Sequence, residues 1–169
     1  MEDWKNTEWQ KKLKNKPVRY WIRDEIEEII KEENIDRKRF YEYSKFSYND
    51  IIKRFYYSFV DYEKNPKIDL SYCWLRFRKE LKKVALISEM SYDWTEFLEK
   101  IKSSVPISED NKFYVILSEE WVYEGYADEI FKVLSETDYL LEDFYIVSQK
   151  FDWFISYTTD GCCAVIYKK

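Results

Sequence analysis

Residues 144–167 read FYIVSQKFDWFISYTTDGCCAVIY, and they decide the class of fold expected for this chain of 169 residues. Three segments within them, residues 144–147, 153–157 and 162–167, are short, mostly apolar and rich in β-branched and aromatic side chains, which is typical of strands. Thr158-Thr159-Asp160-Gly161 separates the last two segments, and Asp-Gly is a strong signal for a hairpin turn. We therefore expect three strands here, the last two joined as a hairpin.

The chain just before this stretch alternates between strands and helices. Residues 113–117 are apolar on both faces, as expected of a strand inside a sheet. Apolar residues at helical spacing predict one helix before this strand and one after it. They are Trp94, Phe97, Leu98 and Ile101 in the first helix, and Ala127, Ile130, Phe131 and Leu134 in the second.

Residues 71–90 allow two interpretations. Cys73, Leu75 and Phe77 alternate with polar residues, which favours a strand at 72–78 and a second at 84–88. Residues 76–83 also contain good helix formers, so a helix is the alternative.

The first half of the chain is predicted to be helical. Ile22, Ile26, Ile29 and Ile30 form one apolar stripe, with acids around it, in a helix at 21–33. A shorter helix is expected at 36–43, and residues 4–14 have weaker helical character. Residues 47–50 resemble a capping box before a helix that should run to about Tyr62. The fold class is therefore α+β: N-terminal helices followed by a mostly antiparallel sheet with packed helices.

The length fits one domain, residues 1–169, with a helical part at 1–70 and a sheet-containing part at 71–169. The chain contains no histidine, and its two glycines are Gly125 and Gly161. Without imidazole there is no Ser-His-Asp triad, no Cys-His pair and no His-ligated metal. Two distant glycines exclude the P-loop and the dinucleotide fingerprint. We expect no catalytic residue, no metal and no cofactor.

The cysteines and the N-terminus favour the cytoplasm. Cys73, Cys162 and Cys163 are an odd number without paired spacing, and we expect buried, reduced thiols. The acidic start of the sequence leads us to expect no signal peptide, and no apolar run is long enough for a membrane helix.

The net charge of −5 is divided unevenly along the chain. Residues 1–85 hold 21 Lys or Arg and 16 Asp or Glu, whereas residues 86–169 hold 7 and 17. An acidic half of this strength argues against nucleic acid and favours a basic protein as partner. The alternative is a solvated acidic face that has no partner.

The candidate site lies between the strand at 113–117 and the helix that follows it. It consists of two aromatic anchors and five carboxylates: Glu119, Glu120, Trp121, Tyr123, Glu124, Asp128 and Glu129. Trp and Tyr surrounded by acids have the composition of a protein interface with a steering rim. In the competing interpretation, the two rings close the edge of the sheet and the acids are solvated.

Two other kinds of chemistry are alternatives to this interface. Glu119, Glu120, Asp128 and Glu129 could form a catalytic carboxylate pair or a site for a hard divalent metal. Arg37-Lys38-Arg39, next to Phe40 and Tyr41, could contact nucleic acid. Acids are common in this chain, and a basic run of three residues is usually a solvated face.

Four stretches resemble a group of short, uncharacterised bacterial proteins that is described as a domain of unknown function. They are residues 21–26 (WIRDEI), 72–75 (YCWL), 113–120 (FYVILSEE) and 143–155 (DFYIVSQKFDWFI). The resemblance extends from about Trp21 to the end of the chain. It implies a small cytosolic α+β protein and a role beside bacterial toxin systems.

Taken together, these features predict a protein-binding module rather than an enzyme. We expect an immunity protein or antitoxin that occludes a basic toxin. Trp121 and Tyr123 would be the anchors, and the five acids would be the rim. The alternative is a small enzyme that depends on carboxylates or a divalent metal.

Overall fold

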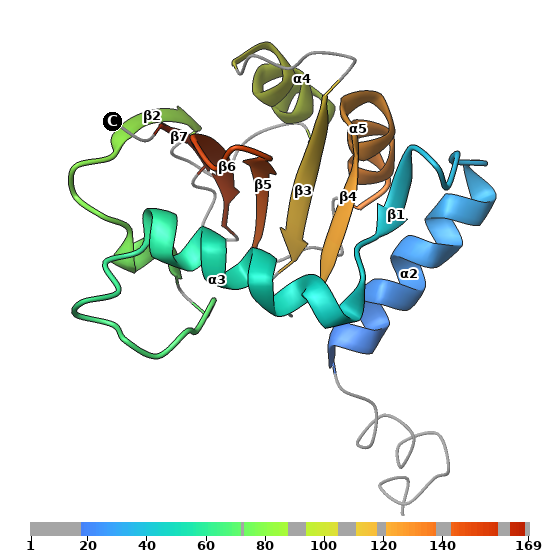
Figure 1. The fold of residues 1–169 in the computed structure, drawn as a ribbon. Coiled ribbons are helices and arrows are strands. Elements are labelled where there is room, and N and C mark those ends of the chain that lie inside the picture. The colour runs from blue at the N-terminus through green and yellow to red at the C-terminus, as the bar shows by residue number, and fades with distance from the viewer. Residues whose placement is uncertain are drawn as a thin grey trace, which may run out of the picture.

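The computed structural model of the chain describes residues 18–71, 73–87, 94–104, 111–117, 121–137, 143–158 and 163–167. Within these ranges, four α-helices and seven strands form an α+β fold, as the sequence predicted (Figure 1). The helices are α2 (Val18–Glu32), α3 (Tyr48–Phe59), α4 (Trp94–Ser104) and α5 (Ala127–Ser135). The strands are β1 (Phe40–Glu42), β2 (Lys82–Ile87), β3 (Lys112–Leu117), β4 (Val122–Tyr126), β5 (Phe144–Ser148), β6 (Trp153–Tyr157) and β7 (Cys163–Tyr167).

The strands form one sheet with the order β1-β4-β3-β5-β6-β7-β2, and each neighbouring pair is antiparallel. The three C-terminal strands that the sequence predicted are confirmed. β6 and β7 pair from Tyr157↔Cys163, as a hairpin requires. Residues 159–162 of the expected Asp-Gly turn lie outside the described residues.

Helices cover both faces of the sheet, because neighbouring residues in a strand point to opposite sides. Phe55 of α3 packs on the face that carries Tyr145 and Phe154, at ring distances of 4.9 and 5.1 Å. α2 and α5 cover the opposite face, where Ile26 and Ile130 approach Val115. α4 packs against α5 and β2. In Figure 1, α3 accordingly lies in front of the sheet and α5 behind it.

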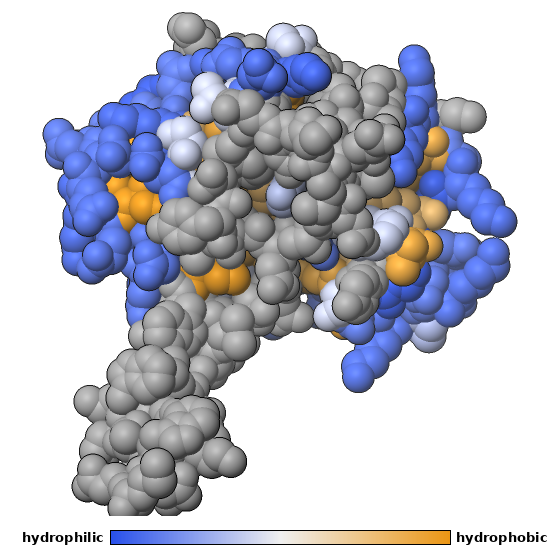
Figure 2. All heavy atoms as spheres, turned by 180° about the vertical axis from the view of Figure 1, so that it is seen from behind, coloured by the Kyte–Doolittle hydropathy of each residue, from blue (hydrophilic) through white to orange (hydrophobic). Residues whose placement is uncertain are grey.

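The buried residues of both layers form one hydrophobic core that extends from Ile22 to Tyr157. Its centre is aromatic: Phe59 lies 4.4 Å from Phe154, and Phe55 contacts both Phe59 and Tyr145. From behind, the described residues at the two sides of the molecule are mostly hydrophilic (Figure 2). In the described ranges, we find no helix with the length and apolar character needed to cross a bilayer.

α2 ends in a Schellman motif, although no glycine follows this helix in the sequence. Asn34 has a φ of 51°, in the left-handed region. The N–H of Ile35 donates to the carbonyl of Ile30 at 2.9 Å, and that of Asn34 donates to Lys31 at 3.3 Å. These bonds satisfy two of the last carbonyls of the helix. The chain thereby turns back towards the sheet, and Ile35 is buried.

The helix expected at 36–43 is wrong, because residues 40–42 form the edge strand β1. Its partner is β4, with Phe40 opposite Gly125. A Cβ on Gly125 would lie 2.6 Å from the carbonyl oxygen of Arg39 and 2.9 Å from the Phe40 ring. Only glycine allows this close approach, so pairing with a distant strand overrides the local helical pattern.

Other boundaries also differ from the sequence-based expectations. The strand expected at 72–78 is wrong: Cys73–Arg76 forms the 3₁₀ turn η3, and only Phe77 pairs, with Val60. Because Val60 is extended, α3 ends at Phe59 instead of about Tyr62. Ser47 does precede α3, but its side chain makes no capping hydrogen bond, so the capping box is wrong. Residues 4–14 lie outside the described residues.

We expect Gly125→Ala to lower the free energy of unfolding by about 2 kcal/mol, because the added methyl group must push β1 away from β4. Denaturant titration measures this change. The exposed Lys38→Ala in the same connection is the control, and it should change stability by less than about 0.5 kcal/mol. Equal stability of the two variants would show that the close approach is not a constraint.

Two buried tyrosines should respond in opposite ways to loss of the hydroxyl. The Tyr56 hydroxyl donates to the carbonyls of Asn65 and Lys67 at 2.8 and 2.9 Å, whereas the buried Tyr145 hydroxyl has no partner in the described part of the chain. Tyr56→Phe should therefore destabilise by about 1 kcal/mol. Tyr145→Phe should be neutral or stabilising, because it removes a buried polar atom that lacks a hydrogen bond. Thermal and denaturant unfolding of both variants test this contrast.

Candidate protein-binding surface

The two predicted anchors are part of the core. Trp121 is 4% exposed, and Tyr123 is fully buried. The Trp121 ring packs edge-on against Tyr48 at 5.8 Å, and Tyr123 stacks on Phe40 at 5.1 Å. Because β1 takes the edge of the sheet, β4 is an inner strand and these rings are covered. The prediction that Trp121 and Tyr123 are surface anchors is therefore wrong.

The described members of the acidic rim are paired within the molecule. Glu124 is 7% exposed and accepts a hydrogen bond from the Tyr41 hydroxyl. Glu129 accepts from Arg39 Nε at 2.5 Å. Asp128 is more exposed and lies 3.6 Å from Lys102 Nζ. The sequence-based prediction that Glu124 belongs to a solvated rim is therefore wrong.

The remaining predicted site residues, Glu119 and Glu120, lie outside the described residues. The described acids do not converge either, since Glu129 is paired with a residue just before β1 and Asp128 with one in α4. Across the described ranges, no group of three or more acidic or cysteine side chains is placed to hold a metal. The geometry gives no support to a shared carboxylate or metal site here.

Sequence reasoning missed a partly buried network around Glu124. Lys112 Nζ donates to the Tyr41 hydroxyl at 3.0 Å and lies 3.6 Å from Glu124 Oε1. Burial raises the pKa of Tyr41, and its hydrogen bond to Glu124 acts in the same direction. The hydrogen bond to Tyr41 and the nearby charge of Glu124 raise the pKa of Lys112. The network therefore keeps the phenol protonated and the ammonium charged, and it joins β1, β4 and β3.

The basic run at 37–39 is also used internally. Arg37 Nη1 donates to Glu27 at 2.8 Å, while Arg39 is held by Glu129 and stacks over Tyr126 at 4.2 Å. Two of its three cations thus bind carboxylates of the same chain. This is the opposite of what a phosphate-binding run needs, since such cations must be available to the phosphates.

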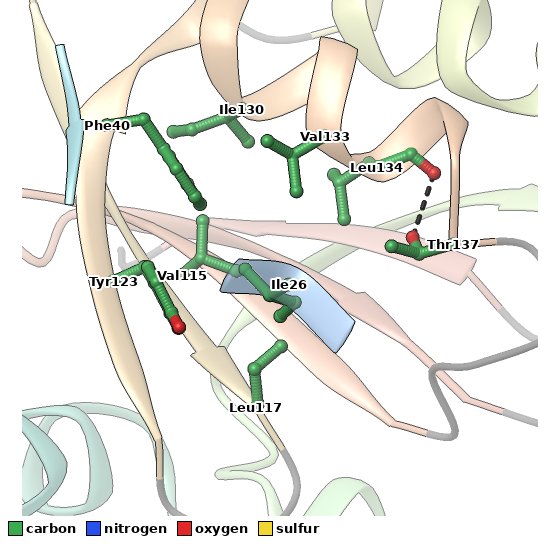
Figure 3. A pocket seen from close by; sticks show the side chains of 9 residues that line it. All are labelled: Ile26, Phe40, Val115, Leu117, Tyr123, Ile130, Val133, Leu134 and Thr137. Carbon is green, nitrogen blue, oxygen red and sulfur yellow. Dashed lines mark hydrogen bonds between the residues drawn. The ribbon is translucent and has the colours of Figure 1, made fainter. Parts of the chain in front are cut away.

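A small apolar cavity lies between α2, α5 and the sheet (Figure 3). Its volume of about 10 Å³ is at most that of one water molecule. It is lined by Ile26, Phe40, Val115, Leu117, Tyr123, Ile130, Val133, Leu134 and Thr137. The Thr137 hydroxyl is turned to the Leu134 carbonyl at 2.8 Å. We interpret this cavity as a packing defect.

A larger hollow of about 320 Å³ lies where β3 begins and β5 turns into β6. Lys112, Lys150 and Asp152 are among its lining residues. Ser148 Oγ donates to Asp152 at 2.5 Å and accepts from the Asp152 backbone N–H at 3.1 Å. These polar groups hold the β5–β6 turn, so their geometry is explained without a ligand.

The solvent side of α2 carries the most regular group of acids among the described residues. Ile22, Ile26, Ile29 and Ile30 are buried against the sheet and α5. Asp24, Glu28 and Glu32 follow one another at i, i+4 and i+8 on the other side, with Glu25 beside them. Glu28 and Glu32 are exposed, and the Asp24 side chain is 47% exposed. We call Asp24, Glu25, Glu28 and Glu32 the α2 acidic face.

The α2 acidic face was visible in the sequence as acids around the isoleucine stripe. What the sequence could not show is how the flanks of this face are fixed. Arg23 Nε donates to Glu42 at 2.8 Å, and Glu42 also accepts from the Tyr48 hydroxyl. These bonds tie α2 to β1 and α3, so its carboxylates project from a rigid support. In Figure 2, α2 lies at the left edge, where hydrophilic residues dominate.

The fold and this charged helix define a small α+β protein. A family model described as a family of unknown function, DUF6756, matches residues 18–169. The chain therefore belongs to this family, and the predicted resemblance to an uncharacterised family is confirmed. No curated protein and no solved structure matches the chain.

A double-mutant cycle tests whether the network around Glu124 is coupled. We expect Glu124→Gln and Lys112→Met to show a coupling energy of about 1 kcal/mol in denaturant titrations, because Glu124 is shielded from water. The matched control is the exposed pair of Asp61 and Lys64, whose Nζ lies 3.3 Å from the carboxylate. Solvent screening should keep the coupling in that pair below about 0.5 kcal/mol. Equal coupling in the two pairs would contradict this account of the network.

Proposed function

We propose that this protein is a protein-binding module of the immunity-protein or antitoxin type, which neutralises a basic partner by covering it. The observation that carries the proposal is the α2 acidic face: four carboxylates on the solvent side of a helix that is fixed to the sheet. A rigid surface loses little conformational entropy on binding. It also presents its charges at constant positions, which favours recognition by complementary charge.

The physical argument is electrostatic steering. A toxin that cleaves nucleic acid must attract phosphate, so its active cleft is cationic. A row of carboxylates would be drawn to such a cleft and would raise the rate of association above that of an uncharged surface. Once bound, the helix would exclude the substrate by occupying the same charges.

This proposal moves the docking surface away from residues 119–129. Glu124 and Glu129 are already neutralised by Lys112 and Arg39, so they offer little charge to a partner. The α2 acidic face keeps an excess of negative charge, although Arg23 Nη1 lies 3.9 Å from the Asp24 carboxylate and Lys31 is a nearby exposed cation. We therefore assign to the α2 acidic face the docking role that the sequence analysis assigned to residues 119–129.

We place the protein in the cytoplasm as part of the proposal. Cys73 is a free, fully buried thiol, and burial raises its pKa to about 12. A thiol that stays protonated is unreactive. Such a cysteine needs no oxidising compartment, and it fits the reducing interior in which an immunity protein would meet its toxin.

The test measures association kinetics with a candidate partner, which is a basic protein encoded next to the gene for this chain. We expect Glu28→Lys/Glu32→Lys to lower the association rate about tenfold at low salt, with a smaller effect on dissociation. The difference should shrink as salt is raised, because surface charges are screened. Stopped-flow fluorescence or surface plasmon resonance measures both rates.

The matched control is Glu96→Lys/Glu99→Lys, which makes the same change in net charge on the exposed side of α4. It should leave the association rate within about twofold of the unmodified protein. If both double variants slow association equally, the effect reflects net charge and α2 is not the docking surface. If the adjacent basic protein does not bind at all, the immunity role is wrong.

A further inference from the structure

The segment between β1 and α3 exposes one aromatic side chain almost completely. Phe46 lies in the 3₁₀ turn η2 (Lys45–Ser47) and is 98% exposed. The next most exposed large apolar residue in the described part of the chain is Leu75, at 66%. Burial of an apolar ring stabilises a fold, so a ring left in water adds almost nothing to stability. Phe46 therefore has nearly its whole apolar surface available to a partner.

The backbone on the α3 side of Phe46 is held in place. The N–H of Ser47 donates to the Ser44 carbonyl at 2.8 Å, which closes the turn. Tyr48, the first residue of α3, is buried, and its ring packs edge-on against Trp121 at 5.8 Å. Phe46 is thus presented by a short turn that leads into an anchored helix, and its backbone has little conformational entropy to lose when a partner binds.

A continuous set of contacts joins this turn to the α2 acidic face. The Tyr48 hydroxyl donates to Glu42, and Arg23 of α2 donates to the same carboxylate at 2.8 Å. Arg23 Nη1 also lies 3.9 Å from Asp24, the first member of the α2 acidic face. Phe46 is two residues from Tyr48, so their Cα atoms are at most about 7 Å apart. Figure 1 accordingly shows the start of α3 beside the N-terminal half of α2.

One partner is large enough to cover both features. Asp24 and Glu32 are eight residues apart in α2, which corresponds to about 12 Å along the helix axis. A standard protein interface buries about 800 Å² on each partner, equivalent to a patch about 30 Å across. The α2 acidic face and Phe46 fit within such a patch. An aromatic ring beside exposed carboxylates also matches the usual division of an interface into an apolar centre and a polar rim.

We propose that Phe46 is the apolar anchor of the docking surface, and that its ring enters an apolar pocket beside the cationic cleft of the basic partner. This inference rests on the proposed function and names a feature that the partner must have. The carboxylates act over a distance and set the rate of encounter. The ring acts only in contact, so it sets the lifetime of the complex. It takes the role that the sequence analysis assigned to Trp121 and Tyr123, which are buried.

Other occupants fit less well, because carboxylates lie beside the ring. A base of a single-stranded nucleic acid could stack on Phe46, but the phosphates would be repelled by the α2 acidic face. An anionic membrane surface would be repelled in the same way. A second copy of this chain, bound symmetrically, would bring two acidic faces together. A basic protein is the occupant whose charge complements the carboxylates next to the ring.

The test compares Phe46→Ser with the unmodified chain in binding to the candidate basic partner that tests the proposed function. We expect Phe46→Ser to raise the dissociation rate about tenfold and to leave the association rate within about twofold. Glu28→Lys/Glu32→Lys should show the reverse pattern. The effect of Phe46→Ser should persist at high salt, whereas that of the charge variant should shrink. Surface plasmon resonance at two salt concentrations measures all four rates.

Two controls separate a binding role from a structural one. Tyr57→Ser removes a 46% exposed ring near the other end of α3, and it should change neither rate. Phe46→Ser should leave the midpoint of denaturant unfolding unchanged, because the ring is not part of the core. A clear fall in that midpoint, or equal effects of the two variants on dissociation, would overturn the assignment of Phe46 as the anchor.

The outcomes distinguish this inference from the proposed function. If association depends on Glu28 and Glu32 but Phe46→Ser dissociates no faster, the anchor is wrong and the proposed function stands. If Phe46→Ser dissociates faster but the charge variant associates normally, the ring and the α2 acidic face do not form one surface. If the candidate partner does not bind, both proposals are wrong. Binding of a single-stranded oligonucleotide that is lost in Phe46→Ser would assign the ring to nucleic acid instead.

Discussion

The structure depends on the contact between β1 and β4 at Gly125. The absence of a side chain there lets the backbone of Arg39 and the ring of Phe40 come close enough to pair. Once β1 occupies the edge, Arg39 reaches Glu129, Tyr41 reaches Glu124, and Glu42 reaches Arg23. The burial of Tyr123 follows from the same pairing, since it stacks on Phe40. One glycine therefore determines which acids are neutralised and which remain at the surface.

The uneven charge of the chain has an internal explanation. The first half is basic and the second acidic, and cations from the first half bind acids of the second, as Arg39 binds Glu129. An acid of the first half is used too, since Arg37 donates to the Glu27 carboxylate at 2.8 Å. Charge counted along a sequence thus measures complementarity within the fold as well as attraction to partners. The α2 acidic face itself lies in the half with the smaller net charge.

The sequence pattern correctly predicted those helices and strands whose conformation depends on nearby residues or on an element that is adjacent in the sequence. The isoleucine stripe of α2, the apolar spacing of α5, and the strands β5, β6 and β7 were all expected. β1 was missed because three residues carry no strand period, and their conformation comes from β4, far along the chain. The same cause explains the error at Trp121 and Tyr123. A segment of alternating aromatic and acidic residues reads as a surface loop unless the strand that covers it is known.

The two edge strands of the sheet, β1 and β2, pair with strands that lie much later in the chain. Phe40 pairs with Gly125, and Lys82 pairs with Tyr167, a separation of 85 positions in each case. Closing loops of this length costs conformational entropy before the contacts between the strands form, which slows folding. On the ribosome, the chain emerges from its N-terminus, so β2 has no strand to join until β7 has been synthesised. The apolar side of α2 likewise stays uncovered until β4 and α5 appear. The nascent protein therefore completes its sheet only after β7 has emerged, and chaperones have their longest opportunity to act on the segments that precede β3.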